Sequence, residues 1–332
     1  MTAQLAPIIG VSPAIKDATA LIERFAPTAL PILLIGATGT GKELFARQIH
    51  HQSRRSGQLV DVNCGALPQE MAESLLFGHR RGAFTGAVES VAGHLERADS
   101  GTLFLDEVLH LSLSAQVKLL RALETGEVQP LGAGHKQRVD FRIVSAAQED
   151  TPERLDRGLF RHDLFQRLAG IVIDLPLLVD RPEDIVPLAQ HFAARRGQVL
   201  DSGAKRVLRR YAWPGNVREL RLAIERAGCL VENGRLPAGA IREAINLGQP
   251  RERECGERRT VKSRDAAELL ARCESNGFDA ARVAESIGLR KSAVYNRLKA
   301  AGISLRLLRR TGKLEFHRHS TGKPENGSAE NS

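Results

Sequence analysis

The chain has 332 residues, of which 42% are apolar and 26% are charged. This composition excludes collagen-like, disulfide-scaffold and wholly disordered chains, and the length favours about two domains. The net charge of +9 is uneven: the segment from Arg251 to the end carries 18 basic and 11 acidic residues, and the rest is close to neutral. A basic end segment is either a solvated tail or a surface for a polyanion, and charge alone favours neither.

The cysteines and the apolar runs indicate the compartment of the protein. Cys64, Cys229, Cys255 and Cys273 have no Cys-x-x-Cys spacing and no cluster of histidines nearby, which is typical of reduced thiols rather than of a metal site. The N-terminus lacks the basic and apolar stretches of a signal peptide. The apolar run 30–37 is far shorter than the roughly 18 residues that cross a bilayer. We therefore expect a cytoplasmic protein with no membrane partner.

The first 199 residues alternate between strand and helix patterns. Apolar runs of strand length occur at 31–35, 59–62, 102–105, 141–146 and 171–174. Helical patterns occur before the first run and between most of the others, at 13–26, 43–52, 113–125 and 184–195. This alternation predicts an α/β fold with a parallel sheet that is covered by helices on both faces.

The strand pattern stops near residue 200, and the remainder divides into smaller parts. Residues 200–247 show only helical patterns and are expected to form an all-α subdomain. Residues 248–264 are rich in Arg, Glu and Gly, which is typical of a linker. Helical patterns return at 265–312, and the polar residues 313–332 have the composition of a disordered tail.

A glycine-rich loop joins the first predicted strand to the next helix. Closely spaced glycines allow successive backbone N–H groups to surround a phosphate, and the helix N-terminus adds partial positive charge. A lysine at the start of the helix can bridge the outer phosphates. The predicted nucleotide-binding residues are Gly36, Ala37, Thr38, Gly39, Thr40, Gly41, Lys42 and Glu43. Glu43 departs from the general motif, in which a Ser or Thr at this position holds Mg²⁺.

Two carboxylates, Asp106 and Glu107, follow the strand pattern at 102–105. Ligands of α/β sheets bind at the carboxyl ends of the strands. Asp106 would hold the Mg²⁺ that bridges the terminal phosphates, and Glu107 would orient or deprotonate the attacking water. Alone, such a pair is more often a solvated turn, but the phosphate loop upstream favours the catalytic interpretation.

A third motif, Gly82-Ala83-Phe84-Thr85-Gly86-Ala87, lies between these two. A phenylalanine among small residues cannot build a core, so the segment is either an ordinary loop or a hairpin tip that presents Phe84 to a partner. The hexapeptide resembles the GAFTGA loop of the sigma-54-dependent transcriptional activators, which are bacterial enhancer-binding proteins and AAA+ ATPases. The segments 63–67, 73–79, 99–107 and 213–220 stand in the order and spacing of that family, and the resemblance covers nearly the whole chain.

This resemblance implies an AAA+ core with a helical lid, and it assigns roles to further residues. The family usually ends its phosphate loop in Lys-Glu, which accounts for Glu43. Asn63 matches the residue that couples the catalytic glutamate to the nucleotide state. Arg161 and Arg167 match the segment that supplies arginine fingers to a neighbouring subunit's ATP. Arg218 matches the second sensor, which reaches the phosphates from the lid.

Two places depart from the family pattern. Ala147 and Gln148 stand where the family has Thr-Asn at its first sensor, and Val179 stands where an arginine is common. Both departures concern the coupling of hydrolysis to movement and leave nucleotide binding untouched. Trp213, the only tryptophan of the chain, is expected to pack the lid against the sheet.

The C-terminal segment has the pattern of a helix-turn-helix. Apolar residues between 284 and 298 would form the inner face of two short helices joined at Gly288, and nine basic residues but one acidic residue lie between Arg282 and Lys313. A generic helical hairpin with a basic face is the alternative. The segment also resembles the Fis-type DNA-binding domain of the same activators. The expected DNA contacts are Arg290, Lys291, Ser292, Tyr295, Asn296, Arg297 and Lys299.

The resemblance therefore implies an activator that binds upstream DNA and hydrolyses ATP with Mg²⁺ to remodel the closed complex of the sigma-54 RNA polymerase holoenzyme. The implied assembly is a homo-oligomeric ring, a hexamer. About twelve residues precede the first predicted helix, so we expect no receiver domain and control by a regulatory protein in trans or by abundance. Two other classes stay open: a different DNA-associated AAA+ remodelling ATPase of replication or repair, and a DNA-binding repressor with a regulatory ATP site.

Overall fold

The computed structural model describes residues 6–148, 151–249 and 283. The chain divides into two compact units, 1–250 and 251–332, and the elements below all belong to the first. Most of the linker expected at 248–264, the helix-turn-helix expected at 265–312 apart from Val283, and the tail at 313–332 lie outside the described residues. Across the described residues, no helix combines the length and the apolar character that crossing a membrane requires.

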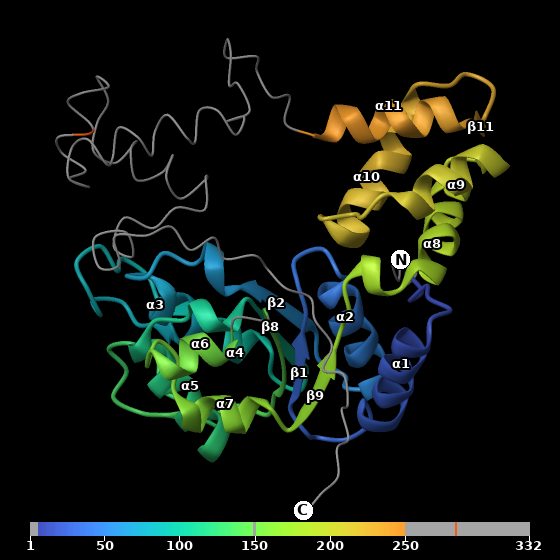
Figure 1. Ribbon diagram of the computed structural model, residues 1–332. Coiled ribbons are helices and arrows are strands. Elements are labelled where there is room, and N and C mark those ends of the chain that lie inside the picture. Colours follow the sequence, from blue (N-terminus) through green and yellow to red (C-terminus); the bar gives the residue numbers. More distant parts are fainter. Residues whose placement is uncertain (1–5, 149–150, 250–282, 284–332) are drawn as a thin grey trace, which may run out of the picture. The chain divides into compact units, whose positions relative to one another are not determined.

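A five-stranded parallel sheet forms the centre of the first unit, in the order β2–β5–β8–β1–β9 (Figure 1). Its strands are β1 (Ile32–Ile35), β2 (Leu59–Asn63), β5 (Thr102–Asp106), β8 (Arg142–Ala147) and β9 (Ile171–Asp174). The predicted α/β class is confirmed, and each strand begins and ends within one residue of its predicted range. The apolar runs predict these strands well because a parallel sheet buries both faces of its central strands.

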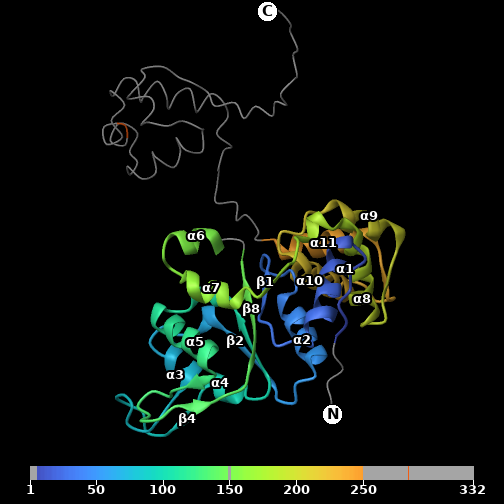
Figure 2. The ribbon, with the colours of Figure 1, turned by 90° about the horizontal axis from the view of Figure 1, so that it is seen from below.

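Helices and short hairpins surround this sheet. The core helices are α1 (Pro13–Phe25), α2 (Lys42–Ser53), α3 (Ala72–Phe77), α4 (His94–Arg97), α5 (Leu113–Thr125), α6 (Thr151–Asp156) and α7 (His162–Leu168). Two antiparallel pairs stand outside the sheet: β3 (Gly78–His79) with β4 (Val91–Ala92), and β6 (Glu127–Val128) with β7 (Gln137–Arg138). Helices α1 and α2 lie on one side of the sheet, and α5 and α7 lie on the other (Figure 2).

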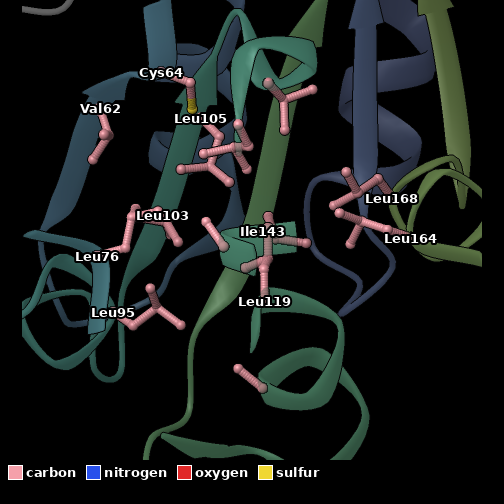
Figure 3. Close-up of a cluster of buried hydrophobic side chains, with 14 of the residues drawn as sticks. Val62, Cys64, Leu76, Leu95, Leu103, Leu105, Leu119, Ile143, Leu164 and Leu168 are labelled. Carbon is pink, nitrogen blue, oxygen red and sulfur yellow. The ribbon is translucent and has the colours of Figure 1, made fainter. Parts of the chain in front are cut away.

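The alternation of side chains along β1 divides the core into two clusters, because successive residues of a strand point to opposite faces. Ile32 and Leu34 belong to the cluster that includes α1 and α2, whereas Leu33 belongs to the cluster that includes α5 and α7. Figure 3 shows the second cluster, in which sheet residues meet helix residues, among them Leu103, Leu105, Ile143, Leu119, Leu164 and Leu168. The sheet is thus held between two apolar layers.

A second group of helices forms the lid, with a buried cluster of its own that begins at Leu178. Its elements are α8 (Pro182–Ala194), α9 (Ser202–Arg210), α10 (Asn216–Cys229) and α11 (Ala238–Gly248). The sequence placed the start of the lid at residue 200, since the pattern of α8 does not reveal which core it faces. The lid also differs from the expected all-α subdomain by one short parallel pair, β10 (Val199–Leu200) with β11 (Arg235–Leu236).

Trp213 packs inside the lid, and the expectation that it packs the lid against the sheet is wrong. Its side chain is 1% exposed within the lid cluster, and its indole Nε1 donates to the Leu208 carbonyl at 2.9 Å. The Tyr211 ring meets it edge-on at 4.8 Å. Sequence alone identifies a tryptophan as a core residue but does not say which of two adjacent cores receives it.

We expect Leu34→Ala to lower the free energy of unfolding by about 3 kcal/mol, because it leaves a cavity between β1 and the two helices that cover it. The side chain of Leu34 is fully buried, whereas that of Leu30 is 44% exposed, so Leu30→Ala is the matched control and is expected to stay close to wild type. Urea unfolding followed by far-UV circular dichroism measures both. Equal midpoints for the two variants would contradict the described packing of β1.

Candidate active site

A cavity of about 520 Å³ lies where the phosphate loop, the end of β5 and the lid meet. Its volume is within the range of small-molecule sites, roughly 300–1,000 Å³. One part of its lining is apolar and comes from the segment before α1 and from the lid: Ile8, Ile9, Leu188, Phe192 and Val217. The other part is polar and charged and includes 38–43, Asn63, Asp106, Glu107, Arg181 and Arg218. The cavity therefore suits a ligand with an apolar base and an anionic end.

The phosphate loop between β1 and α2 has the backbone that glycine permits. Gly39 and Gly41 have φ of +82° and +113°, a region that residues with side chains rarely adopt. A Cβ on Gly39 would overlap the carbonyl oxygen of Gly215 in the lid. Gly41 precedes the first turn of α2, in which the Leu44 N–H donates to the Gly41 carbonyl at 2.8 Å, whereas the Lys42 and Glu43 N–H groups have no acceptor within the helix. These N–H groups and the helix dipole make the loop fit an anion.

Lys42 lies at the floor of the cavity beside two carboxylates. Its Nζ donates to the carbonyl oxygens of Gly36 at 2.7 Å and Ala37 at 3.1 Å. Burial lowers the pKa of the Lys42 ammonium, and the negative charges of Asp106 and Glu107 act in the opposite direction. Burial likewise raises the pKa of the Asp106 carboxyl, and Lys42 opposes that rise. The cation and the carboxylates therefore stabilise each other's charged forms in a partly desolvated site.

Glu43, the departure from the general motif, forms an ion pair with Arg47. One turn further along α2, Arg47 donates to Glu43 Oε1 through Nε at 3.2 Å and Nη2 at 2.6 Å. Both side chains are about half exposed, so the pair adds little stability. Its consequence is electrostatic, since the guanidinium offsets a carboxylate that would otherwise repel a phosphate at the start of α2.

Asn63 and Glu107 meet around Gly65. The parallel register of β2 and β5 sets Asn63 beside Asp106, at the carboxyl edge of the sheet. A Cβ on Gly65 would overlap Glu107 Oε2 and would lie 3.3 Å from Asn63 Oδ1. The same Asn63 oxygen accepts from the Ala66 N–H at 3.1 Å. The two predicted residues are thus neighbours, with a glycine between them that leaves room for the carboxylate.

The residues at this edge fit a magnesium ion bound together with a phosphate ligand. Mg²⁺ is usually held by one or two carboxylates, by waters and by substrate phosphates. The Asp106 carboxylate lines the cavity at the end of β5, and one of its oxygens, Oδ1, accepts from the Glu107 N–H at 2.9 Å. The other oxygen is of the type that Mg²⁺ prefers.

Asn216 ties the lid to the phosphate loop, a role that the sequence did not predict. Its Nδ2 donates to the Thr38 carbonyl at 3.1 Å, and its Oδ1 accepts from the Leu178 N–H at 2.8 Å. The residue is 2% exposed, and its φ of +52° is one that asparagine adopts more readily than most residues. The signal in the sequence was an asparagine at a helix start after Pro-Gly, but its partners are far away along the chain.

Arg181 and Asp184 form a second buried connection that the sequence did not predict. Arg181 Nη2 donates to the Thr40 carbonyl at 3.2 Å, and its Nη1 lies 3.9 Å from Asp184 Oδ2. Asp184 also accepts from the Ser12 N–H at 2.8 Å and the Ser12 hydroxyl at 2.6 Å. Burial lowers the pKa of Arg181, and Asp184 opposes this. The segment before α1, the start of α8 and the phosphate loop are therefore joined at one point.

The two predicted arginine fingers lie at the two ends of α7, and neither lines the cavity. Arg161 precedes the helix, and its guanidinium makes two hydrogen bonds to Asp163, at 3.0 and 2.6 Å. Arg167 donates to the Leu123 carbonyl at 3.2 Å. Both side chains are exposed on the surface of the core. Arg218, by contrast, lines the cavity, and its positive charge lowers the pKa of Lys42.

The segment Gly82–Ala87 forms the tip of the β3–β4 hairpin, at the margin of the core (Figure 2). The Gly82 N–H donates to the Ala87 carbonyl at 2.8 Å, which closes the tip, and Gly82 and Gly86 have positive φ. Phe84 is 45% exposed, with its ring 5.0 Å from that of His79. Because Phe84 and Thr85 are exposed at a closed tip, the loop presents both to solvent.

The positions that depart from the family pattern lie close to the phosphate loop or on the lid. Ala147 is buried at the end of β8, and its carbonyl accepts from the Gly36 N–H at 3.2 Å. The Gln148 carbonyl accepts from the Thr151 hydroxyl at 2.7 Å. Val179 is 49% exposed at the start of the lid. Ala147 thus contacts the loop through its backbone carbonyl.

The parallel sheet, the phosphate loop and the helical lid define an AAA+ nucleotide-binding fold. Residues 8–174 match the family described as the Sigma-54 interaction domain, and residues 179–257 match the AAA+ ATPase lid domain. The first match spans half of the chain, so the chain belongs to the family of sigma-54 interaction domains. The resemblance read from the sequence is confirmed for the core and lid, and its Fis-type part stays a prediction.

Curated relatives and solved structures agree with this membership. The chain is 50% identical over 228 residues to the nitric oxide reductase transcription regulator NorR2 of Cupriavidus necator, covering 66% of this chain and 44% of that protein. It is 45% identical over 251 residues to the anaerobic nitric oxide reductase transcription regulator NorR of Escherichia coli O157:H7, covering 73% and 50%. The chain therefore spans about half the length of these curated relatives.

Among solved structures, NtrX of Brucella abortus in complex with ATP aligns with a TM-score of 0.66 and 32% identity, over 90% of this chain and 70% of that one. A mutant of RuvB from Thermotoga maritima aligns with a TM-score of 0.51 and 15% identity, over 92% and 95%. The second likeness concerns the fold alone.

We expect Asn216→Ala to lower the free energy of unfolding by about 3 kcal/mol, since it leaves the Thr38 carbonyl and the Leu178 N–H without their buried partner. Asn246→Ala, at an exposed asparagine on α11, is the matched control. Urea unfolding followed by both Trp213 fluorescence and circular dichroism reports the lid and the whole chain separately. Wild-type midpoints for Asn216→Ala would show that these bonds do not hold the lid on the loop.

Proposed function

We propose that this chain is a sigma-54-dependent transcription activator that hydrolyses ATP to convert the closed complex of sigma-54 RNA polymerase into an open complex. The observation that carries the proposal is the combination of a phosphate loop facing two carboxylates with an exposed GAFTGA tip on one core. A nucleotide switch alone would need the first feature, and a different AAA+ motor would have no need of the second. The family membership and the ATP complex of NtrX support the choice of ATP.

In this proposal each residue around the cavity has its own role in ATP hydrolysis. The N–H groups that begin α2 bind the phosphates, and Lys42 exchanges the Gly36 and Ala37 carbonyls for phosphate oxygens. Asp106 would hold Mg²⁺, which neutralises charge on the terminal phosphates. Glu107 orients the attacking water and accepts its proton, and Asn63, its neighbour across Gly65, couples Glu107 to the nucleotide state. Arg218 brings the lid to the phosphates.

The exposed arginines support a ring in which each site is completed by a neighbour. Arg161 and Arg167 lie outside their own subunit's cavity, so they can reach an ATP only across a subunit interface. A guanidinium placed there stabilises the charge that develops on the transferring phosphoryl group. We therefore propose a homo-oligomeric ring, a hexamer, as the active assembly.

The remaining parts of the proposal concern partners. The Phe84–Thr85 tip would grip the sigma factor, and the Fis-type segment with Arg290, Asn296 and their neighbours would bind upstream double-stranded DNA. The basic excess between Arg282 and Lys313 supports a polyanion partner.

We expect Lys42→Ala and Glu107→Gln to abolish ATP turnover in different ways. Loss of the Lys42 ammonium removes a contact to the phosphates and weakens nucleotide binding, whereas Glu107→Gln keeps the shape of the side chain and removes the base, so binding persists. Phosphate release measures turnover, and titration with a fluorescent ATP analogue measures binding. Turnover in either variant at the wild-type rate would contradict the assignment of Lys42 and Glu107 to the active site.

We expect Thr85→Ala to leave ATP turnover close to wild type and to abolish open-complex formation at a sigma-54 promoter. Thr85 is exposed at the hairpin tip and does not line the cavity, so the hydroxyl serves a partner and not the substrate. Thr28→Ala, the same change in the turn after α1, is the control and is expected to activate normally. Normal activation by Thr85→Ala would show that the tip is an ordinary loop.

A further inference from the structure

Gln116 is a fully buried polar side chain outside the cavity, on the first turn of α5. Its Oε1 accepts from the Arg161 backbone N–H at 2.9 Å. Its Nε2 donates to the Leu159 carbonyl at 3.1 Å and to the Leu111 carbonyl at 2.8 Å. A buried amide is costly unless it is hydrogen-bonded. The Gln116 amide therefore requires these three backbone groups to stay in place.

The three partners of Gln116 belong to two segments with different tasks. Leu159 and Arg161 belong to the segment that immediately precedes α7 and carries the exposed arginine. Leu111 ends the short turn that follows Glu107, and its N–H donates to the Val108 carbonyl at 3.2 Å. One side-chain amide therefore joins the segment that carries the exposed arginine to the segment that carries the water-orienting glutamate.

A second contact joins the same two segments independently. Arg154, on α6, donates through Nη1 to the Leu109 carbonyl at 3.2 Å, and its Nη2 lies 3.1 Å from His110 Nε2. His110 in turn lies near Glu107, with Nδ1 3.3 Å from the Glu107 carbonyl. Residues 109–111, after Glu107, are thus held at Arg154 and, through Gln116, at Leu159 and Arg161, and Gln116 is the fully buried member of this contact.

The Arg161 guanidinium itself is held only loosely. Its bonds to Asp163 are exposed to water, so they are weak constraints on its position. The backbone beneath it is anchored in the core by the Gln116 amide. The Arg161 backbone is therefore held by the Gln116 amide on its N–H and by the Phe165 N–H on its carbonyl, at 3.0 Å, whereas Asp163 holds only the exposed guanidinium.

We propose that Gln116 is a positioning residue for Arg161, through which the segment after Glu107 in one subunit sets the arginine finger that serves its neighbour. The proposal rests on the proposed function, in that it requires Arg161 to act across a subunit interface. Gln116 touches neither the substrate nor the reacting atoms. Its effect is on a site in the next subunit, and this separates it from a residue that only supports folding.

The test uses the full chain and the variant Gln116→Met, which keeps the length of the side chain and removes the amide. We expect kcat for ATP to fall about tenfold to a hundredfold, the loss that a misplacement of about 1 Å causes, with KM and nucleotide affinity unchanged. Gln198→Met is the matched control, because its Nε2 donates to the Gly228 carbonyl in the lid at 2.9 Å. It is expected to keep wild-type kcat, and thermal unfolding of both variants checks the fold.

The decisive experiment mixes subunits of two variants, so that one variant can supply the arginine finger and the other the intact site. Lys42→Ala subunits have a defective site but intact fingers, whereas Gln116→Met subunits have an intact site but a misplaced finger. A mixture is expected to turn over ATP faster than either variant alone. The mixture of Arg161→Ala with Lys42→Ala is the reference, and recovery there alone would overturn the role of Gln116. Failure of recovery in the reference mixture would instead overturn the proposed arginine finger.

A second variant keeps the proposal testable if Gln116→Met folds poorly. Gln116→Glu, buried and therefore held as the neutral acid, retains an oxygen acceptor for the Arg161 N–H and one O–H donor for a carbonyl, and loses the second donor. We expect it to keep more turnover than Gln116→Met and to be rescued in the same mixture. Equal kcat for Gln116→Glu and Gln116→Met would show that the bond to Arg161 does not matter.

Discussion

The site depends on the hydrogen bonds between the lid and the Gly39 carbonyl of the phosphate loop. That oxygen accepts from the N–H groups of both Val217 and Arg218, at 2.9 and 3.3 Å, so the first turn of α10 is built directly on the phosphate loop. The close approach excludes any side chain at Gly39. Loop and lid are therefore joined directly by backbone hydrogen bonds at this point.

Much of this architecture could be predicted from the sequence, for physical reasons that differ between its parts. The sheet was predictable because buried parallel strands such as Ile32–Ile35 must be apolar throughout. The phosphate loop was predictable because its chemistry requires glycines and a lysine at fixed spacing. Asp106 and Glu107 followed from the loop, since carboxyl ends of parallel strands share one edge.

What sequence reasoning missed are the contacts between segments far apart in the chain. Asn216 and Arg181 bind backbone carbonyls of the phosphate loop, and a carbonyl leaves no mark in the sequence. Trp213 was assigned to the wrong core because a sequence pattern shows that a residue is buried but not which neighbouring element covers it. Asp184 reads as an ordinary first-turn carboxylate of α8, yet it is fully buried against Ser12.

The buried charges around the cavity explain why the loop and its surroundings form one unit. An unpaired charge away from water is costly, and each charge here meets a carbonyl or an opposite charge: Lys42 faces Asp106 and Glu107, and Arg181 faces Asp184. Such a network strengthens electrostatic interactions because water screens partly buried charges less than exposed ones. A phosphate that enters it replaces carbonyl partners of Lys42 with full negative charge. The ligand thereby stabilises the same groups that hold the loop, the segment before α1 and the lid together.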